Sequence, residues 1–388
     1  MTLMTLNGDC REMLQTLPAQ SVQCVVTSPP YYGLRKYSDD PREIGREATP
    51  ALYVAALVEV FRQLRRVLRD DGTVWLNLGD SYGRGDRVKW SGDAQRGTNA
   101  HKVVTEAGGY GATPAILPDK NLLGIPWRVA FALQDDGWYL RSDIIWNKPN
   151  CMPESVTDRP TRAHEYVFLL TKSARYFYDA AAIAEPAMLT GGGTVGTPDK
   201  AARAGDTTNG MGATTLRSKE GTTRNRRTVW TIATQPYSGA HYATMPEALI
   251  APCILAGSSA QACEHCGAAW VRVVERTPMQ IPERKQAERP GVESIEGIND
   301  GARRRAMNGK VWAETARTTT TGFAPACACA NNTGSAASTV LDPFGGSGTV
   351  GKVAMRYQRN AVLIELNQAY IDDHIDTRTD GVQVELFV

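Results

Sequence analysis

A glycine-rich turn between two apolar segments constrains the fold of this chain most. The turn reads Asp342-Pro343-Phe344-Gly345-Gly346-Ser347-Gly348-Thr349 and follows residues 338–341, whose β-branched residues predict a strand. The spacing after the turn predicts a helix from Thr349 to about Tyr357 and a second strand over 360–364. Glycines let a backbone approach a ligand closely, and a helix start offers free N–H groups. The order of strand, turn, helix and strand is typical of α/β proteins with a parallel sheet.

An acidic residue, Glu365, directly follows the second of these strands. A carboxylate at that edge of a parallel sheet can accept hydrogen bonds from both hydroxyls of a ribose. No G-K-[ST] follows the glycines, which makes a phosphate cradle less favoured. Asp342, just before the turn, either caps the strand end or faces a positively charged part of the ligand. A glycine turn alone is equally typical of a purely structural loop. The interpretation as a binding turn for a ribose-containing ligand therefore depends on Glu365, which follows the turn by one helix and one strand.

A second motif, Thr27-Ser28-Pro29-Pro30-Tyr31, ends a predicted buried strand over 22–27. Two prolines fix the backbone and remove its N–H groups, which leaves carbonyls available. The Ser28 hydroxyl and the Pro29 carbonyl could then accept the two hydrogens of a planar exocyclic amine. Tyr31 offers a face on which the ring could stack. These residues alone are as well explained by a strand-ending turn with an aromatic plug.

Composition indicates a globular protein that acts on its partners through local charge. The chain has 388 residues, 42% of them hydrophobic, and no apolar run long enough for a membrane span, so a cytoplasmic location is expected. The net charge of only +2 excludes a global electrostatic attraction to nucleic acid. Between 203 and 227, however, six basic residues face two acidic ones, a density suited to phosphate contacts or to a solvated loop. The basic residues are Arg203, Arg217, Lys219, Arg224, Arg226 and Arg227.

Four of the eight cysteines form two close pairs, Cys263 with Cys266 and Cys327 with Cys329. Cys263-Glu264-His265-Cys266-Gly267 has the spacing of a metal knuckle, in which two thiolates share a tight turn. The second pair is less regular and the gap between the pairs is long. The sequence therefore predicts a structural zinc ion with four thiolate ligands, with free cysteines as the alternative.

Together the two motifs resemble those of the amino-methylating DNA methyltransferases, which use S-adenosylmethionine (SAM). The S-P-P-Y tetrapeptide preceding the glycine turn is similar to the permuted order of the β class. Further similar segments are Asn7-Gly8-Asp9-Cys10, residues 141–150 and residues 241–246. The resemblance covers roughly residues 5–80, 120–185, 228–257 and 338–373.

The resemblance implies a fold, a cofactor and a role for each motif. The fold is a Rossmann-like α/β domain with a mostly parallel seven-stranded sheet, permuted motif order and a small zinc-ribbon-like insertion. SAM is the expected cofactor and a flipped-out base of double-stranded DNA the expected substrate. The implied catalytic residues are Ser28, Pro29, Pro30 and Tyr31. The implied SAM contacts are Asp9, Asp342, Phe344, Gly345, Gly346, Ser347, Gly348, Thr349 and Glu365.

The resemblance also divides the chain. Residues 1–185 form the catalytic half, 186–227 a basic flexible loop for target recognition, and 228–258 a return to the core. Residues 259–338 are the cysteine-containing insertion, and 339–388 the SAM-binding half. Within the basic loop the expected DNA contacts are Arg217, Lys219, Arg224, Arg226 and Arg227.

The identity of the methylated base is left with two answers. In the family that the chain resembles, Ser in the first motif position is commoner among cytosine-N4 enzymes, which favours N4 of cytosine, and N6 of adenine is the alternative. Two further alternatives are a non-catalytic zinc-containing DNA-binding protein and a protein-glutamine methyltransferase. A homodimer and a cognate restriction endonuclease are the other expected partners.

Overall fold

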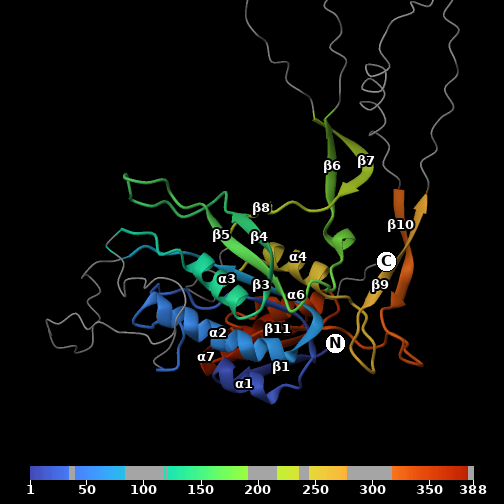
Figure 1. The fold of residues 1–388 in the computed structure, drawn as a ribbon, viewed down its shortest axis with the longest axis horizontal. Helices are drawn as coiled ribbons and strands as arrows, with labels where there is room; N and C mark the ends of the chain where they lie inside the picture. Colours follow the sequence, from blue (N-terminus) through green and yellow to red (C-terminus); the bar gives the residue numbers. More distant parts are fainter. Residues whose placement is uncertain are drawn as a thin grey trace, which may run out of the picture.

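A computed structural model describes residues 1–34, 40–83, 118, 120–190, 216–235, 244–277 and 317–382 (Figure 1). The strands are β1 (Leu3–Asn7), β2 (Val22–Thr27), β3 (Leu68–Leu78), β4 (Tyr139–Asn147), β5 (His164–Thr171), β6 (Glu185–Thr190), β7 (Leu216–Arg224), β8 (Val229–Thr231), β9 (Trp270–Thr277), β10 (Arg317–Pro325), β11 (Thr339–Asp342) and β12 (Asn360–Glu365). The helices are α1 (Cys10–Thr16), α2 (Pro50–Val67), α3 (Ile125–Asp135), α4 (Glu247–Gly257), α6 (Thr349–Arg356), α7 (Gln368–Tyr370) and α8 (Asp376–Thr379), with a 3-10 turn η1 (Ala180–Ile183) and a π-helical turn η3 (Ile371–Ile375).

The central sheet has the strand order β1-β12-β11-β2-β3-β5-β4-β8. Only β5 runs against its neighbours, so the expectation of a mostly parallel sheet is met. The expected count of seven strands is wrong for the described part of the chain, which contributes eight. The additional edge strand is β8, whose three residues pair with the carboxyl-terminal end of β4. Such a short strand has too few residues to show a two-residue alternation in the sequence.

The sheet is covered on both faces, as its fully buried central strand β2 requires. On one face, Val25 and Leu341 pack in a cluster with residues of α1, α2 and α3. On the other face, Cys24, Val26 and Val340 pack with residues of α4 and α6. This alternation along β2 follows from the pleat, which sends successive side chains to opposite faces. The result is a three-layer α/β domain.

The longest helix, α2, follows signals that are visible in the sequence. Thr49 caps its start by accepting a hydrogen bond from Leu52 N at 3.2 Å, and Pro50 occupies the first turn. Its buried residues recur at helical spacing and include Tyr53, Leu57 and Leu64. By contrast, α4 is apolar all round because it is buried among the sheet, η1 and α6.

Two antiparallel ladders, β6 with β7 and β9 with β10, extend away from the central sheet (Figure 1). The first belongs to the stretch 186–227, whose described ends are therefore strands rather than loop; residues 191–215 lie outside the described residues. The second ladder belongs to the cysteine-containing insertion. No helix among the described residues is long and apolar enough to cross a membrane.

Candidate active site

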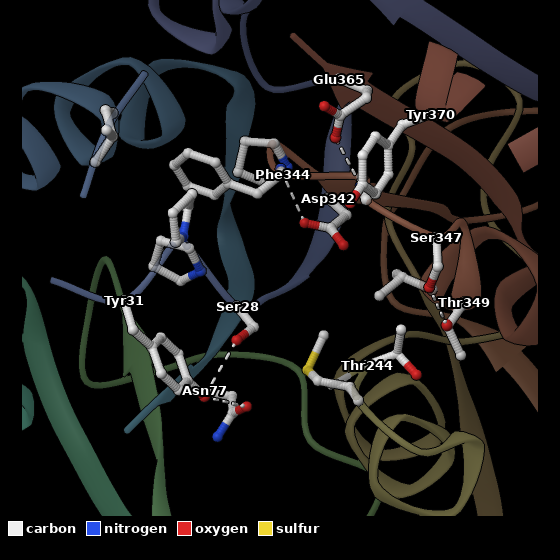
Figure 2. Close-up of a pocket in the computed structure, with 18 of the residues that line it drawn as sticks. Ser28, Tyr31, Asn77, Thr244, Asp342, Phe344, Ser347, Thr349, Glu365 and Tyr370 are labelled. Atoms are coloured by element: carbon white, nitrogen blue, oxygen red, sulfur yellow. Dashed lines mark hydrogen bonds between the residues drawn. The ribbon is translucent and has the colours of Figure 1, made fainter. Parts of the chain in front are cut away.

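A cavity of about 380 Å³ lies where β1, β2, β11 and β12 end, and both sequence motifs line it. Figure 2 shows its two sides: Ser28, Tyr31 and Asn77 stand opposite Phe344, Glu365 and Tyr370. The volume is in the range of small-molecule sites. Asp9 and all residues of the two motifs except Thr27 and Gly348 line the cavity.

The glycine turn is shaped by its left-handed residues. Gly346 has φ +50° and Gly348 has φ +73°, a region that favours glycine. Gly348 N donates to Gly345 O at 2.9 Å, and Gly348 is the N-cap of α6. A Cβ on Gly345 would lie 3.3 Å from the Ile364 carbonyl oxygen, so the turn lies close against β12. Gly348 is not among the residues that line the cavity, and its contact with SAM stays a prediction.

Glu365 ends β12 and holds the glycine turn through its carboxylate. Gly346 N donates to Glu365 Oε2 at 2.8 Å, and Asn367 N donates to Oε1 at 2.9 Å. Burial raises the pKa of Glu365 despite these backbone hydrogen bonds. The carboxylate lines the cavity and keeps lone pairs for two ligand hydroxyls.

Asp342 is fully buried at the end of β11. Thr27 Oγ1 donates to its Oδ1 at 2.7 Å, and Phe344 N donates to the same oxygen at 3.0 Å. Burial raises the pKa of Asp342 to about 8, although these two hydrogen bonds act in the opposite direction. Both functions that the sequence allowed are compatible with this position, since Asp342 shapes the strand end and lines the cavity.

Asp9 lies beside the cavity as the N-cap of α1. Its carboxylate accepts from Arg11 N at 2.8 Å and forms an ion pair with Arg11 Nη2 at 2.5 Å. Burial opposes ionisation, but the Arg11 hydrogen bonds and charge outweigh it and lower the pKa of Asp9. Asp9 therefore offers an ionised carboxylate whose oxygens Arg11 already holds.

The two prolines of the S-P-P-Y motif have different surroundings. Tyr53 Oη donates to the Pro30 carbonyl oxygen at 2.8 Å, which anchors the loop to α2. No described donor reaches the Pro29 carbonyl, and Pro29 lines the cavity beside Ser28. The two acceptors predicted for an exocyclic amine are therefore both at the cavity and open to a ligand.

Tyr31 joins a polar network that no sequence motif indicates. Tyr31 Oη donates to Glu165 Oε2 at 2.7 Å, and Ser28 Oγ donates to Tyr31 Oη at 3.5 Å. Asn77 Nδ2 donates to Glu165 Oε2 at 3.2 Å, and Lys148 Nζ forms an ion pair with Glu165 Oε1. Glu165 lies on β5 and Lys148 follows β4, so only the antiparallel pairing of these strands brings them together.

The directions of these hydrogen bonds orient Ser28. Burial and the Glu165 charge raise the pKa of Tyr31 well above its ordinary value, so the phenol carries its hydrogen. Glu165 Oε2 at 2.7 Å and Asn77 Oδ1 at 3.2 Å can both only accept from Tyr31 Oη, with Glu165 the nearer, so the phenol hydrogen points to them and Tyr31 Oη accepts from Ser28. The Ser28 lone pairs are then left for a donor in the cavity.

Three of the basic residues predicted to contact DNA already make contacts within the protein. Arg224 and Arg227 each donate to Glu185 Oε1 at 2.8 Å, and Arg226 lies over the Trp230 ring at 4.5 Å. Burial alone would raise the pKa of Glu185, but the hydrogen bonds and charges of the two arginines outweigh it and lower the pKa. Arg217 and Lys219 lie on β7, and their side chains are outside the described residues. Their contact with DNA stays a prediction.

The four paired cysteines come together away from the cavity, with their sulfur atoms all within 4.8 Å of one another.

The sequence segment 241–246 is described from Thr244 onward, and Thr244 and Met245 line the cavity. Phe344, Asn367 and Tyr370 line it as well. Among these, Asn367 and Tyr370 carried no sequence signal, because they follow β12 in a segment without a motif.

The three-layer domain and its cavity at the carboxyl ends of parallel strands define a Rossmann-like nucleotide-binding enzyme. A profile for the N6/N4 DNA methylases matches residues 22–262 and 330–376, and the chain belongs to this family of SAM-dependent DNA amino-methyltransferases. The segment between the matched parts, 263–329, holds all four paired cysteines.

The chain is also similar over most of its length to individual methyltransferases. It is 38% identical to the Type II methyltransferase M.Cfr9I of Citrobacter freundii, over 94% of this chain and 84% of that protein. It is 39% identical to the Type II methyltransferase M.SmaI of Serratia marcescens, over 94% and 86%. The solved PvuII DNA methyltransferase (cytosine-N4-specific) has the same fold, with a TM-score of 0.53, 14% identity and coverage of 99% of this chain and 89% of that one.

Proposed function

We propose that the protein methylates the N4 amino group of cytosine in double-stranded DNA at a specific site. The alternative that keeps the same chemistry is N6 of adenine. The observation that carries the proposal is the pair of open acceptors, Ser28 Oγ and the Pro29 carbonyl, at one end of the cavity. Both amine hydrogens of a flipped-out base could be accepted there, which draws the nitrogen lone pair out of the ring.

The other end of the cavity fits SAM. Glycine at 345 avoids a Cβ contact with Leu363 and Ile364, Glu365 offers acceptors to the ribose hydroxyls, and Asp342 offers a carboxylate to the sulfonium side. When bound, SAM supplies a methyl group activated by a sulfonium leaving group, so the protein has to provide position more than a strong base. Phe344, Ser347 and Thr349 complete this side.

On the base side, the chain's own residues hold the amine and keep Ser28 in its acceptor orientation. Ser28 accepts one amine hydrogen and donates its own hydrogen to Tyr31, which donates to Glu165. Lys148 stabilises the Glu165 carboxylate. A base leaving the duplex stack loses a few kcal/mol of stacking and pairing, which contact with Tyr31 would offset in part.

Cytosine is favoured over adenine by one feature of the base side, since the neutral Ser28 hydroxyl could accept from the amine of either base. Lys148 lines the cavity and, with one hydrogen given to Glu165, has two left for a carbonyl acceptor. Cytosine presents such an oxygen at O2, whereas adenine has none.

The partners follow from this activity. Relatives named Type II methyltransferases support a place in a restriction-modification system, with a cognate endonuclease that cuts the same site. Arg217, Lys219, Arg224, Arg226 and Arg227 are the proposed phosphate contacts, and a homodimer and a cytoplasmic location remain part of the proposal. An Arg engaged with Glu185 would exchange that partner for a phosphate.

The test is the identity of the methylated nucleoside. The protein is incubated with methyl-labelled SAM and genomic DNA free of amino-methylation, and the DNA is digested to nucleosides. Label in N4-methylcytosine is expected, whereas label in N6-methyladenine would select the alternative. Absence of label in any nucleoside, with SAM binding intact, would overturn the proposal. Ser28→Ala is the matched variant, expected to lose about 10²-fold in turnover while SAM affinity stays unchanged.

A further inference from the structure

We propose that Cys263, Cys266, Cys327 and Cys329 bind one zinc ion that fastens the insertion to the amino-terminal edge of the central sheet. The four sulfur atoms come from two segments more than sixty residues apart and all lie within 4.8 Å of one another. Zinc with Zn–S bonds of about 2.3 Å holds tetrahedral sulfurs about 3.8 Å apart. A small inward movement of the four side chains would therefore complete the site.

Both cysteine pairs are set in turns that direct N–H groups at sulfur. In the first, Gly267 N donates to Cys263 O at 2.8 Å, and His265 N donates to Cys263 Sγ at 3.4 Å. Gly267 has φ +70°, which the tight turn requires. In the second, Asn332 Nδ2 donates to Cys327 Sγ at 3.4 Å. Hydrogen bonds to sulfur of this kind stabilise thiolate ligands.

The segments that hold the two pairs, residues 263–270 and 327–333, are also bound to each other without the metal. Glu264 Oε1 accepts from Thr333 N at 2.8 Å and from Thr333 Oγ1 at 3.0 Å. Trp270 Nε1 donates to Asn332 Oδ1 at 3.2 Å. These contacts fix the relative position of the pairs, so the sulfurs are arranged in advance of metal binding.

The position of the site assigns it a structural role. Gln23 Nε2 donates to Gly267 O at 3.0 Å, and Arg69 Nη1 donates to Cys266 O. Gln23 and Arg69 are the second residues of β2 and β3, so the knuckle rests on the start of both strands. Ser28 lies at the opposite end of β2, about 16 Å away at about 3.3 Å per residue. The metal is therefore too far from the cavity to act on the methyl group.

A structural metal also explains how this insertion can be stable. The ladder β9–β10 leaves Val271, Val273, Val274 and Phe323 exposed, so it has little apolar core of its own. Small units without such a core are usually held by a metal or by disulfides. All eight cysteines are free thiols in this structure, which leaves the four clustered sulfurs available to a metal.

The experiment measures metal in the full-length protein. We expect about one zinc per chain by elemental analysis, and cobalt(II) exchanged into the site should give the absorption of a tetrahedral thiolate complex. A chain with no metal that takes up none, a chain that holds iron instead, or paired disulfides found by thiol titration would each overturn the proposal. The cobalt spectrum needs no variant, so it decides even where a substitution prevents folding.

Two variants and a hydrogen-exchange measurement localise the site. Cys327→Ser is expected to lose most of the bound zinc, whereas Cys151→Ser, a partly exposed cysteine outside the cluster, should keep it. Chelation should increase hydrogen exchange in β9, β10 and the two turns while SAM affinity changes less than about twofold. Zinc retained in Cys327→Ser, or exchange unchanged by chelation, would show that the ion lies elsewhere.

Discussion

Asp342 combines full burial with a single pair of donors, Thr27 Oγ1 and Phe344 N, on one of its oxygens. Burial raises its pKa from 3.8 to about 8, which favours a proton on this residue near neutral pH. A cationic ligand such as a sulfonium would favour the carboxylate instead. Asp342 is therefore a residue at which ligand binding and proton release are coupled.

The raised pKa predicts how stability depends on pH. The folded state keeps a proton on Asp342 that the unfolded chain loses above about pH 3.8, so this residue's contribution is complete below that pH and is lost as the pH rises towards about 8. Asp342→Asn should remove this fall, which amounts to at most about 1.4 kcal/mol per pH unit. Urea unfolding between about pH 5 and pH 8 measures the slope.

Asp158→Asn is the control for this slope. Asp158 is exposed and its hydrogen bond from Lys120 lowers its pKa, so it has lost its proton throughout that range. Its removal should leave the slope as in the original protein. Identical slopes for Asp342→Asn and the original protein would contradict the assignment of the proton to Asp342.

Sequence patterns predicted these residues unequally, for a physical reason. Ser28, Asp342 and Glu365 stand in or beside contiguous motifs at the carboxyl ends of strands, where a parallel sheet gathers its ligand contacts. Glu165 is 134 positions away from Tyr31, and no local pattern marks it. It joins the network through the pairing of β5 with β3 and with β4, which a sequence alone does not give.

At the scale of elements, the strand β3 positions the S-P-P-Y loop through the residue that follows it. Gly79 faces the Tyr31 ring, and a Cβ at Gly79 would lie 2.5 Å from Tyr31 Cε2 and 3.0 Å from Cδ2. The ring is thereby brought to Glu165 and Asn77. The glycine is needed for close approach of two segments, since no side chain fits between the end of β3 and the ring.

Gly79→Ala should therefore displace Tyr31 without affecting the other end of the cavity. We expect turnover to fall about 10²-fold, as for a misplacement of about 1 Å, with SAM affinity unchanged. Stability should fall by about 1–3 kcal/mol because the site is overpacked. Single-turnover methylation and SAM titration measure the two effects separately.

Gly322→Ala provides the matched control. Gly322 lies on β10, and a Cβ there meets nothing within 4 Å. This variant should methylate DNA at the original rate. Normal turnover in Gly79→Ala would mean that the ring's position does not limit the reaction.

The elements differ in how far their sequences predicted them. α2 is the most predictable of them, because the cap at Thr49 and the apolar spacing within Pro50–Val67 are local signals. The ladder formed by β6 and β7 was expected as a loop, since its strands are polar and its order depends on pairing between distant segments. β3 begins at Leu68 and includes Asp70, Asp71 and Gly72, residue types that are usually depleted in strands. Tertiary pairing outweighs local preference there.

At the scale of the whole molecule, one sheet is assembled from both ends of the chain. The amino-terminal strand β1 pairs with β12, and β2 pairs with β11. The loops after β2 and β11 therefore face each other across the cavity. The permuted order of motifs in the sequence has no effect on this arrangement, because neighbouring strands need not be consecutive.

Each half of the cavity also contains a glutamate whose two oxygens both accept hydrogen bonds.

The same substitution at these two glutamates should therefore separate base handling from cofactor binding. Glutamine keeps only one acceptor oxygen, so its NH₂ group must face a donor in either place: Lys148, Tyr31 or Asn77 around residue 165, and Gly346 N or Asn367 N around residue 365. Glu165→Gln should lower kcat about 10²-fold and leave SAM affinity unchanged. Glu365→Gln should weaken SAM binding about tenfold or more, as for the loss of a charged hydrogen bond.

Three measurements distinguish this division from a general loss of structure. SAM titration by calorimetry gives the affinity, single-turnover methylation at saturating SAM gives the rate, and the fluorescence of 2-aminopurine at the target position reports whether the base leaves the stack. Glu165→Gln should alter the last two, because Tyr31 and Ser28 lose their fixed orientation, and Glu365→Gln should alter only the first. If both variants lost SAM affinity and rate together, the two ends of the cavity would not act independently, and the roles derived from their separate hydrogen-bond networks would be wrong.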